Sequence, residues 1–178
     1  MTMGPEPAQT TALVRSLVFI GLGANLGDLT QTLSQALDRL AALPETRLQA
    51  VSGIYRSAPV EANGPDYLNA VACLETTLAP LDLLDHLQIL ERAHGRARPF
   101  FNAPRTLDLD LLLYGEQRWQ TERLTLPHPR LQQRAFVLLP LLELVPDLVA
   151  PGLGPLQRFL PAVADQVIAR LDRALSLA

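Results

Sequence analysis

Two aspartates stand two residues apart in the apolar run at residues 107–113, and they are the strongest chemical signal in the sequence. Residues i and i+2 of a β-strand share one face, so Asp108 and Asp110 would lie side by side, with Cα atoms about 6.5 to 7 Å apart. Two carboxylates this close repel each other unless a cation lies between them. Magnesium takes one or two carboxylates plus water and substrate phosphates, and a pair of ions about 4 Å apart would fit one face. The alternative, a solvated strand face, is disfavoured by the apolar character of the run.

An arginine- and proline-rich segment at residues 95–105 directly precedes these aspartates, and it contains Arg96, Arg98 and Arg105. All 15 basic residues of the chain are arginines, which excludes a P-loop lysine and Schiff-base chemistry. Arginine binds phosphate through two parallel hydrogen bonds, so these side chains beside a metal-carboxylate pair favour a triphosphate site. A solvated basic loop is the alternative.

Two further segments carry weaker signals. Pro127-His128-Pro129-Arg130, followed by Arg134 and Phe136, is typical of a rigid loop that presents a histidine. Tyr67 and Asn69 alternate onto one face of an expected strand, where an aromatic ring and an amide can hold a flat heterocycle. Taken alone, the first segment is better explained as an ordinary proline-rich turn, and the second is equally compatible with a turn followed by a routine strand.

The composition narrows the functional class. A net charge of −3 disfavours a basic nucleic-acid binder, and the chain contains no apolar run long enough to span a membrane. Cys73, the one cysteine, lies in an apolar β-like stretch and is expected to fill the core. We expect a cytoplasmic monomer that acts on small molecules.

The periodicity predicts the elements that position these residues. They are strands at 17–20, 48–60, 67–78 and 107–114, a helix from the N-cap Asp28 to Pro44, and a helix from Pro80 closed by Gly95. This order predicts an α+β fold, the ferredoxin-like split βαβ core. A short strand at 123–126 and additional C-terminal helices at 131–144 and 156–175 follow. Residues 1–15 are predicted to be a disordered leader, and residues 16–178 a single domain. Gly21 and Gly23 fit a dinucleotide-binding loop only loosely, and the element order disfavours that interpretation.

Several separated motifs together resemble one family, the 6-hydroxymethyl-7,8-dihydropterin pyrophosphokinases of folate biosynthesis. They are Gly-x-Asn-Leu-Gly-Asp at 23–28, Pro-Asp-Tyr-Leu-Asn-Ala at 65–70, Leu-Glu-Thr at 74–76, Pro-Arg-Thr-Leu-Asp-Leu-Asp-Leu-Leu at 104–112 and Leu-x-x-Pro-His-Pro-Arg at 124–130. The resemblance runs from about residue 18 to about residue 151. It implies transfer of pyrophosphate from ATP to the hydroxymethyl group of 6-hydroxymethyl-7,8-dihydropterin, with release of AMP.

The resemblance also implies a role for individual residues. Asp108 and Asp110 would bind two Mg²⁺ ions, and Arg96, Arg98 and Arg105 would contact the triphosphate. The other implied ATP contacts are Gln88, Glu91, Leu111, Arg123, Thr125, His128 and Arg134. For the pterin, Tyr67 and Phe136 would sandwich the ring, Asn69 would read its polar edge, and Ser57 and Val60 would border the pocket through backbone groups. Phe101 stands where the family usually has a basic residue, so this loop would contact phosphate through a different set of groups.

Three other functions remain open at this point. A different two-metal nucleotide-transfer enzyme would also carry aspartates on a ferredoxin-like sheet. An RNA-binding module would show exposed aromatic residues on its central strands, where residues 107–114 instead have aspartates and leucines. A plain phosphatase or kinase would form ADP or phosphate without any pterin.

Overall fold

The structure, a computed structural model, describes residues 13–59, 63–94 and 107–177. Its central element is a six-stranded sheet in which β10, β3, β4, β1 and β5 follow one another, and β2 pairs with β4 beside β3. All of these pairs are antiparallel, which is incompatible with a parallel dinucleotide-binding sheet. The strands are β1 (Ser16–Ala24), β2 (Thr46–Val51), β3 (Gly53–Ser57), β4 (Tyr67–Thr76), β5 (Asp108–Tyr114) and β10 (Ile168–Ala174).

Two helices cover one face of this sheet, as expected for a ferredoxin-like core. Helix α1 (Leu29–Ala41) begins at Asp28, whose Oδ1 accepts a hydrogen bond from the Gln31 N–H at 3.1 Å. Helix α2 (Pro80–Ala93) begins at the predicted proline. Their leucines pack against the apolar side of β1, β4 and β5 in a single core.

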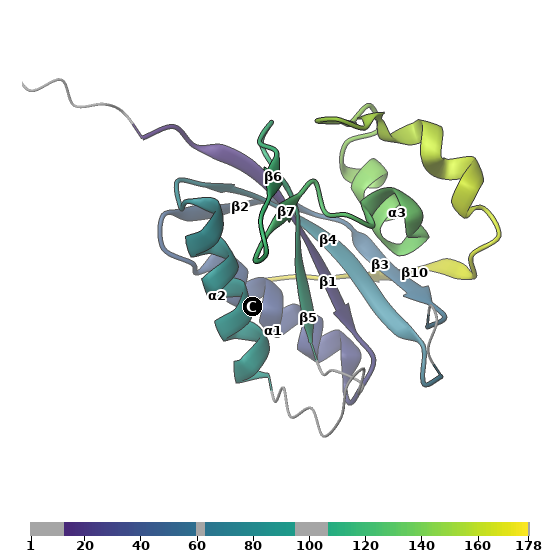
Figure 1. Ribbon diagram of the computed structural model, residues 1–178. Helices are drawn as coiled ribbons and strands as arrows, with labels where there is room; N and C mark the ends of the chain where they lie inside the picture. Colours follow the sequence, from purple (N-terminus) through teal and green to yellow (C-terminus); the bar gives the residue numbers. More distant parts are fainter. Residues whose placement is uncertain (1–12, 60–62, 95–106, 178) are drawn as a thin grey trace, which may run out of the picture.

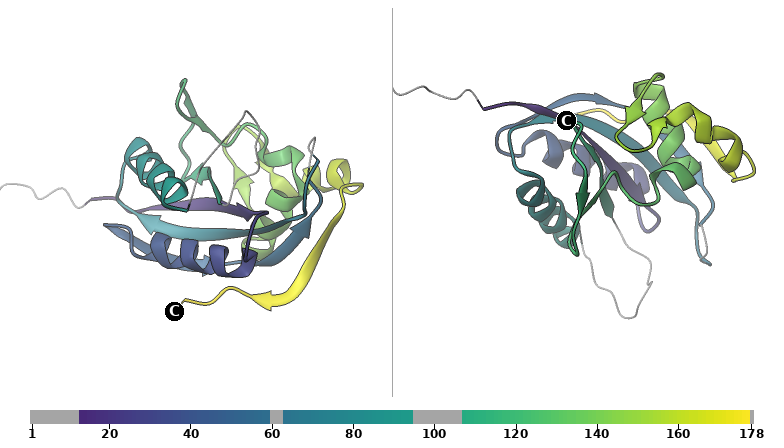
Figure 2. Two further views of the ribbon diagram at one scale, coloured as in Figure 1. Left: turned by 90° about the horizontal axis from the view of Figure 1, so that it is seen from below. Right: turned by 45° about the horizontal axis from the view of Figure 1, so that its top comes forward.

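A second layer covers the opposite face of the sheet, as Figures 1 and 2 show. It contains the 3₁₀ helix η1 (Leu131–Gln133), helix α3 (Ala135–Leu144) and the 3₁₀ helix η2 (Leu156–Val163). Phe19, Val71 and Cys73 point into this layer from the sheet. Cys73 is 7% exposed, so the prediction that it fills the core is confirmed.

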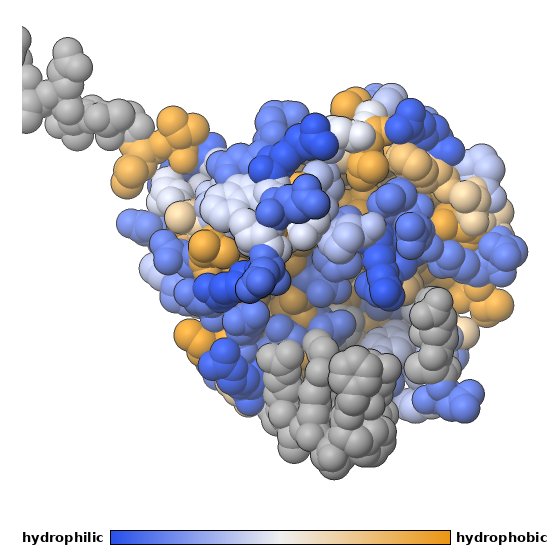
Figure 3. All heavy atoms as spheres, in the orientation of Figure 1, coloured by the Kyte–Doolittle hydropathy of each residue, from blue (hydrophilic) through white to orange (hydrophobic). Residues whose placement is uncertain are grey.

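Two short hairpins complete the fold. β6 (Trp119–Gln120) pairs with β7 (Thr125–Leu126), and β8 (Val149–Ala150) pairs with β9 (Gly154–Pro155). The face drawn in Figure 3 is mainly hydrophilic, and hydrophobic residues stand out beside the start of the described chain, where Leu13 and Val14 are exposed. Within the described ranges, none of the helices has the length and apolar character needed to cross a lipid bilayer.

The prediction of a second C-terminal helix over 156–175 was wrong. Residues 156–163 form the 3₁₀ helix η2, and residues 168–174 form β10, which pairs with β3 at the edge of the sheet. Pro161 interrupts regular helical hydrogen bonding, and the edge of β3 offers backbone partners to the segment that follows. The sheet therefore gains a strand that the helical periodicity did not reveal.

Two predicted strands differ from the observed ones. The expected strand at 48–60 is broken at Ser52, whose Oγ accepts from the Val71 N–H at 2.9 Å and so takes part in the ladder as a side chain. β1 does not end at Gly21 but continues through Gly23 to Ala24.

The expected helix at 131–144 is divided into η1 and α3 at Arg134. Gly95, the expected cap of α2, lies outside the described residues.

Candidate active site

The two aspartates lie opposite two glycines of the neighbouring strand. In the register of β1 and β5, Asp108 pairs with Gly23 and Asp110 pairs with Gly21. On the other side of β1, Gly23 pairs with Asn69 of β4. Because glycine has no side chain, the sheet surface between Asn69 and Asp108 forms an open floor. A Cβ atom at Gly23 would lie 3.3 Å from Asn69 Oδ1, so even one added carbon would crowd this floor.

A cavity of about 530 Å³ opens above this floor. Seven residues predicted for the site line it: Ser57, Tyr67, Asn69, Asp108, Asp110, Arg134 and Phe136. They come from β3, β4, β5 and the start of α3, so the fold brings together groups from distant parts of the sequence. Asn69 is fixed by a hydrogen bond of 2.7 Å from its Nδ2 to Ser57 Oγ. Its Oδ1 faces Gly23.

The carboxylates fit a hard cation that binds through phosphate and water. Among residues 13–59, 63–94 and 107–177, no group of three or more histidine, cysteine, aspartate or glutamate side chains is arranged to hold a metal ion. Two neighbouring carboxylates above a bare floor instead match magnesium, which needs one or two protein carboxylates and leaves its other positions to substrate.

The residues implied in ATP binding are divided among three places. Gln88 and the buried Glu91 lie on α2, which packs against β5, and Leu111 of β5 belongs to the core between the sheet and the two helices. Arg123 pairs with Asp85 of the same helix. Thr125 and His128 line a second cavity of about 560 Å³ beside the β6–β7 hairpin, and Arg134 lines the main cavity.

His128 is held as a neutral imidazole. Burial, then the charge of Arg134, lowers the pKa of His128 to about 4, although Asp108 acts in the opposite direction. Its Nδ1 accepts a hydrogen bond from the Arg130 N–H at 3.2 Å. The single proton of the neutral ring is therefore on Nε2, which is left as a hydrogen-bond donor.

Arg96, Arg98, Arg105 and Val60 lie outside the described residues, so their predicted roles stay predictions. The main cavity is also lined by residues for which the sequence predicted no role in the site, among them Gly21, Gly23, Arg130, Gln133 and Gln166. Arg130 ends the Pro-His-Pro-Arg motif and could have been chosen from that position. Gln166 lies between η2 and β10, where no sequence motif marks it.

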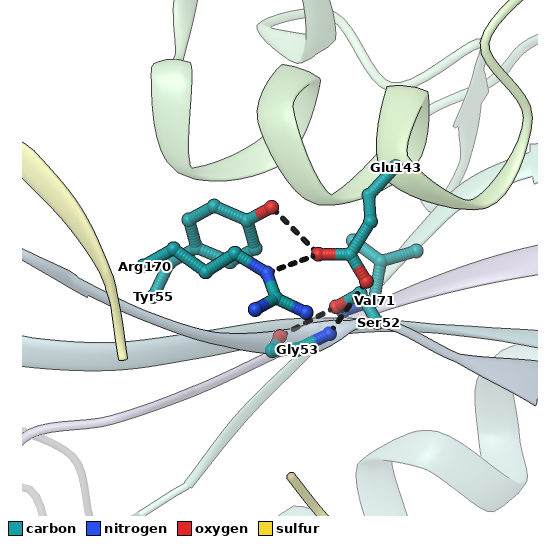
Figure 4. Close-up of polar contacts among 6 residues, drawn as sticks. All are labelled: Ser52, Gly53, Tyr55, Val71, Glu143 and Arg170. Atoms are coloured by element: carbon teal, nitrogen blue, oxygen red, sulfur yellow. Dashed lines mark hydrogen bonds and ion pairs between the residues drawn. The ribbon is translucent and has the colours of Figure 1, made fainter. Parts of the chain in front are cut away.

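A carboxylate at the C-terminal end of α3 anchors that helix to the sheet. Glu143 accepts hydrogen bonds from Gly53 N at 2.8 Å, Tyr55 Oη at 2.7 Å and Arg170 Nε at 2.8 Å (Figure 4). Burial and Glu143 raise the pKa of Tyr55 to about 12, so the phenol remains a donor. This cluster joins α3 to β3 and β10 and keeps the helix above the cavity side of the sheet.

Known proteins match this chain over most of its length. The model of a family described as 7,8-dihydro-6-hydroxymethylpterin-pyrophosphokinase matches residues 19–146. A Pseudomonas aeruginosa protein named 2-amino-4-hydroxy-6-hydroxymethyldihydropteridine pyrophosphokinase is 49% identical over 158 residues, which are 88% of this chain and 98% of its own. A Haemophilus influenzae protein of the same name is 43% identical over 155 residues, or 86% of this chain and 97% of its own.

Solved structures show the same fold at low sequence identity. A crystal structure of Plasmodium falciparum HPPK-DHPS superposes with a TM-score of 0.66 at 12% identity and covers 84% of this chain. The match spans 46% of that longer chain. The likeness supports the ferredoxin-like architecture.

Proposed function

The chain belongs to the 7,8-dihydro-6-hydroxymethylpterin-pyrophosphokinase family, and we propose that the main cavity is where its reaction takes place. The enzyme transfers pyrophosphate from ATP to the hydroxymethyl group of 6-hydroxymethyl-7,8-dihydropterin and releases AMP, a step of folate biosynthesis. The observation that carries the assignment of the cavity is the row Asn69, Gly23 and Asp108 across three adjacent strands. In this row an amide that can bind the pterin and a carboxylate that can hold magnesium lie on either side of a glycine, which leaves the sheet surface between them open.

The pterin is expected to lie at the β4 end of this row. Tyr67 and Phe136 line the cavity and sandwich the flat ring. The Asn69 Nδ2 donates a hydrogen bond to Ser57 Oγ, and its Oδ1 faces Gly23. That oxygen can therefore accept a hydrogen bond from the edge of the pterin. Ser57 and Val60 border the ring through their backbone groups.

Asp108 and Asp110 are proposed to hold two magnesium ions at the other end of the row. Two observations support this metal site: the aspartates share one face of β5, and the residues paired with them on β1 are the glycines Gly23 and Gly21. When bound, the ions neutralise the triphosphate oxygens and lower the pKa of the attacking hydroxyl.

The nucleotide is proposed to contact Gln88, Glu91, Leu111, Arg123, Thr125, His128 and Arg134, with Arg96, Arg98 and Arg105 on the triphosphate. His128 donates from Nε2, since its low pKa keeps the ring neutral at pH 7. Arg134 lines the cavity together with Asp108 and Asp110, where its charge favours the developing negative charge of the transition state.

In the proposed mechanism, the protein aligns the two substrates for in-line transfer. The hydroxyl oxygen of the pterin attacks the β-phosphorus, the bond from that phosphorus to AMP breaks, and the hydroxyl proton passes to solvent. The sequence predicts that the segments at 57–65 and 96–105 close over the substrates and exclude water, a competing nucleophile, and residues 60–62 and 95–106 lie outside the described residues.

Product analysis tests the function directly. Incubated with magnesium, ATP and 6-hydroxymethyl-7,8-dihydropterin, the protein should form AMP that depends on the pterin, with no ADP. Asp110→Ala should lower the rate at least about 10²-fold, because it removes an electrostatic partner of the transferred group. Asp172→Ala, at an exposed position of β10, is the matched control.

Two results would contradict the proposal. Formation of ADP would indicate a single-phosphoryl kinase or a hydrolase. A folded Asp110→Ala variant with wild-type turnover would refute the assignment of the metal site.

The remaining expectations concern the whole protein. We propose that residues 16–178 act as one domain and as a monomer in the cytoplasm, with small-molecule substrates and no nucleic acid partner. Sedimentation equilibrium with and without substrates measures the oligomeric state, and a stable dimer would contradict it.

A further inference from the structure

The side-chain amide of Gln166 closes a bracket around Arg134. Its Oε1 accepts a hydrogen bond from the Ala135 N–H at 2.9 Å, and its Nε2 donates to the Gln133 carbonyl oxygen at 2.8 Å. One partner is a donor and the other an acceptor, so a neutral amide in this orientation satisfies both. The peptide groups on either side of Arg134 are thus held by a single side chain.

The side chain of Gln166 provides the hydrogen-bond acceptor that the first turn of α3 needs. The first N–H groups of a helix have no partner within the helix and need a cap. Arg134, the N-cap residue, forms no side-chain cap within the part of the chain that the structure describes. Gln166 provides one from 31 positions away in the sequence.

Gln166 is itself fixed by the C-terminal part of the fold. Its backbone N–H donates to the Val163 carbonyl at 3.1 Å, and the carbonyl of the next residue, Val167, accepts from the Ala58 N–H at 3.3 Å. β10 begins directly afterwards, where Ile168 pairs with Ser57. The bracket therefore connects α3 to the β3 side of the cavity.

Arg134 and Phe136, two proposed substrate contacts, lie at or beside the backbone that Gln166 holds. The guanidinium carbon of Arg134 is 5.4 Å from the centre of the Phe136 ring, so the two side chains stack. Phe136 and Gln166 line both the main cavity and a smaller one of about 190 Å³. A shift of the Arg134 backbone would therefore tilt the ring that covers the pterin.

We propose that Gln166 is a positioning residue for pterin binding, acting through the backbone of Gln133 and Ala135 to orient Phe136. The inference rests on the proposed function of the cavity. Gln166 lies beyond the residues 19–146 matched by the family model, so the family match assigns it no role.

The test compares three variants of the full chain. Gln166→Ala removes both hydrogen bonds, and Gln166→Glu keeps the side-chain volume but loses the donor to Gln133. Gln157→Ala is the matched control, because Gln157 Nε2 donates to the Pro146 carbonyl at 2.6 Å in the same C-terminal segment and does not line the cavities described above. The dissociation constant of 6-hydroxymethyl-7,8-dihydropterin is measured by calorimetry with a non-hydrolysable ATP analogue, beside KM and kcat.

We expect the dissociation constant and KM for the pterin to rise about tenfold in Gln166→Glu, the scale of one lost hydrogen bond, and at least as much in Gln166→Ala, which loses two. The value of kcat at saturating pterin should stay within about threefold, because Gln166 does not act on the reacting atoms. Gln157→Ala should match the wild type. Circular dichroism at the assay temperature verifies that each variant is folded.

The inference is overturned if folded Gln166→Glu binds the pterin with wild-type affinity, even where Gln166→Ala does not fold. It is also overturned if Gln157→Ala loses the same affinity, since any loosening of the C-terminal segment would then suffice. Failure of the proposed function would instead appear in the wild type, as the absence of AMP formed in response to the pterin.

Discussion

At the scale of single residues, the site depends as much on glycines as on charged residues. Gly21 and Gly23 leave β1 bare between the amide of Asn69 and the two carboxylates. Neither glycine is needed for a positive φ angle, since both belong to a regular strand. Their role is therefore to keep space for substrate rather than to permit a turn.

A β-branched residue at position 23 should separate binding from stability. Gly23→Val adds atoms at a point already 3.3 Å from Asn69 Oδ1 and fills the floor of the cavity. We expect the pterin dissociation constant to rise at least about tenfold, while the free energy of unfolding changes by less than about 1.5 kcal/mol, because the strand propensity of valine offsets the crowding of Asn69. Calorimetry and urea unfolding measure the two quantities.

Gly21→Ala is the control for this substitution, because its Cβ would make an ordinary contact of 3.5 Å with Leu112. Its effect on pterin binding should be clearly smaller. Equal pterin affinity in Gly23→Val and the wild type would show that the floor is not part of the binding site.

At the scale of elements, the anchoring of α3 by Glu143 should depend on pH. Burial opposes the charge of Glu143, but hydrogen bonds from Arg170, Tyr55 and Gly53 outweigh it and lower the pKa of this carboxyl below 4.5. A group whose pKa is lower in the folded state stabilises the protein above its unfolded pKa. That contribution is lost as the pH falls through the folded pKa.

Glu143→Ala should therefore lower the free energy of unfolding at pH 7 by about 1 to 3 kcal/mol, since it leaves the Gly53 N–H and Tyr55 hydroxyl without their acceptor. The difference from the wild type should shrink as the pH falls below 4.5 and passes through the folded pKa, because the native carboxyl then becomes protonated. Urea unfolding at several pH values measures both effects.

Glu75→Ala is a matched control, because its side chain is 28% exposed, like that of Glu143, but its ion pair with Arg15 is longer, at 3.6 Å. Its cost should be smaller, as is usual for surface pairs. A Glu143→Ala cost that stays constant as the pH falls from 7 through the acid range below 4.5 would contradict the role of the charge.

At the scale of the whole molecule, the sequence predicted the parts that local patterns determine. Asp28 and Pro80 marked the starts of α1 and α2, and the alternation in residues 107–114 placed both aspartates on the cavity face of β5. Tyr67, Asn69 and Phe136 line the same cavity, and their contact with the pterin stays a prediction.

What escaped prediction depends on contacts between distant segments. The residues of β10 share apolar spacing with a helix, and only the unpaired edge of β3 makes the extended form preferable. The break at Ser52 arises because its hydroxyl replaces a backbone group opposite Val71. Gln166 lies just before β10, and its side chain bonds to the first turn of α3, 31 positions away in the sequence.

Because Cys73 is buried, its reaction with a thiol reagent can measure how often the layer that contains α3 opens away from the sheet. Cys73 is the single thiol of the chain, and it lies on β4 beneath the layer of α3. Burial raises the pKa of the Cys73 thiol, which lowers its reactivity while the layer is closed. The rate at which a thiol reagent labels the native protein then reports how often α3 lifts, long before the molecule unfolds. Glu143→Ala should label faster than the wild type, and pterin bound beside Phe136 should slow the labelling of both.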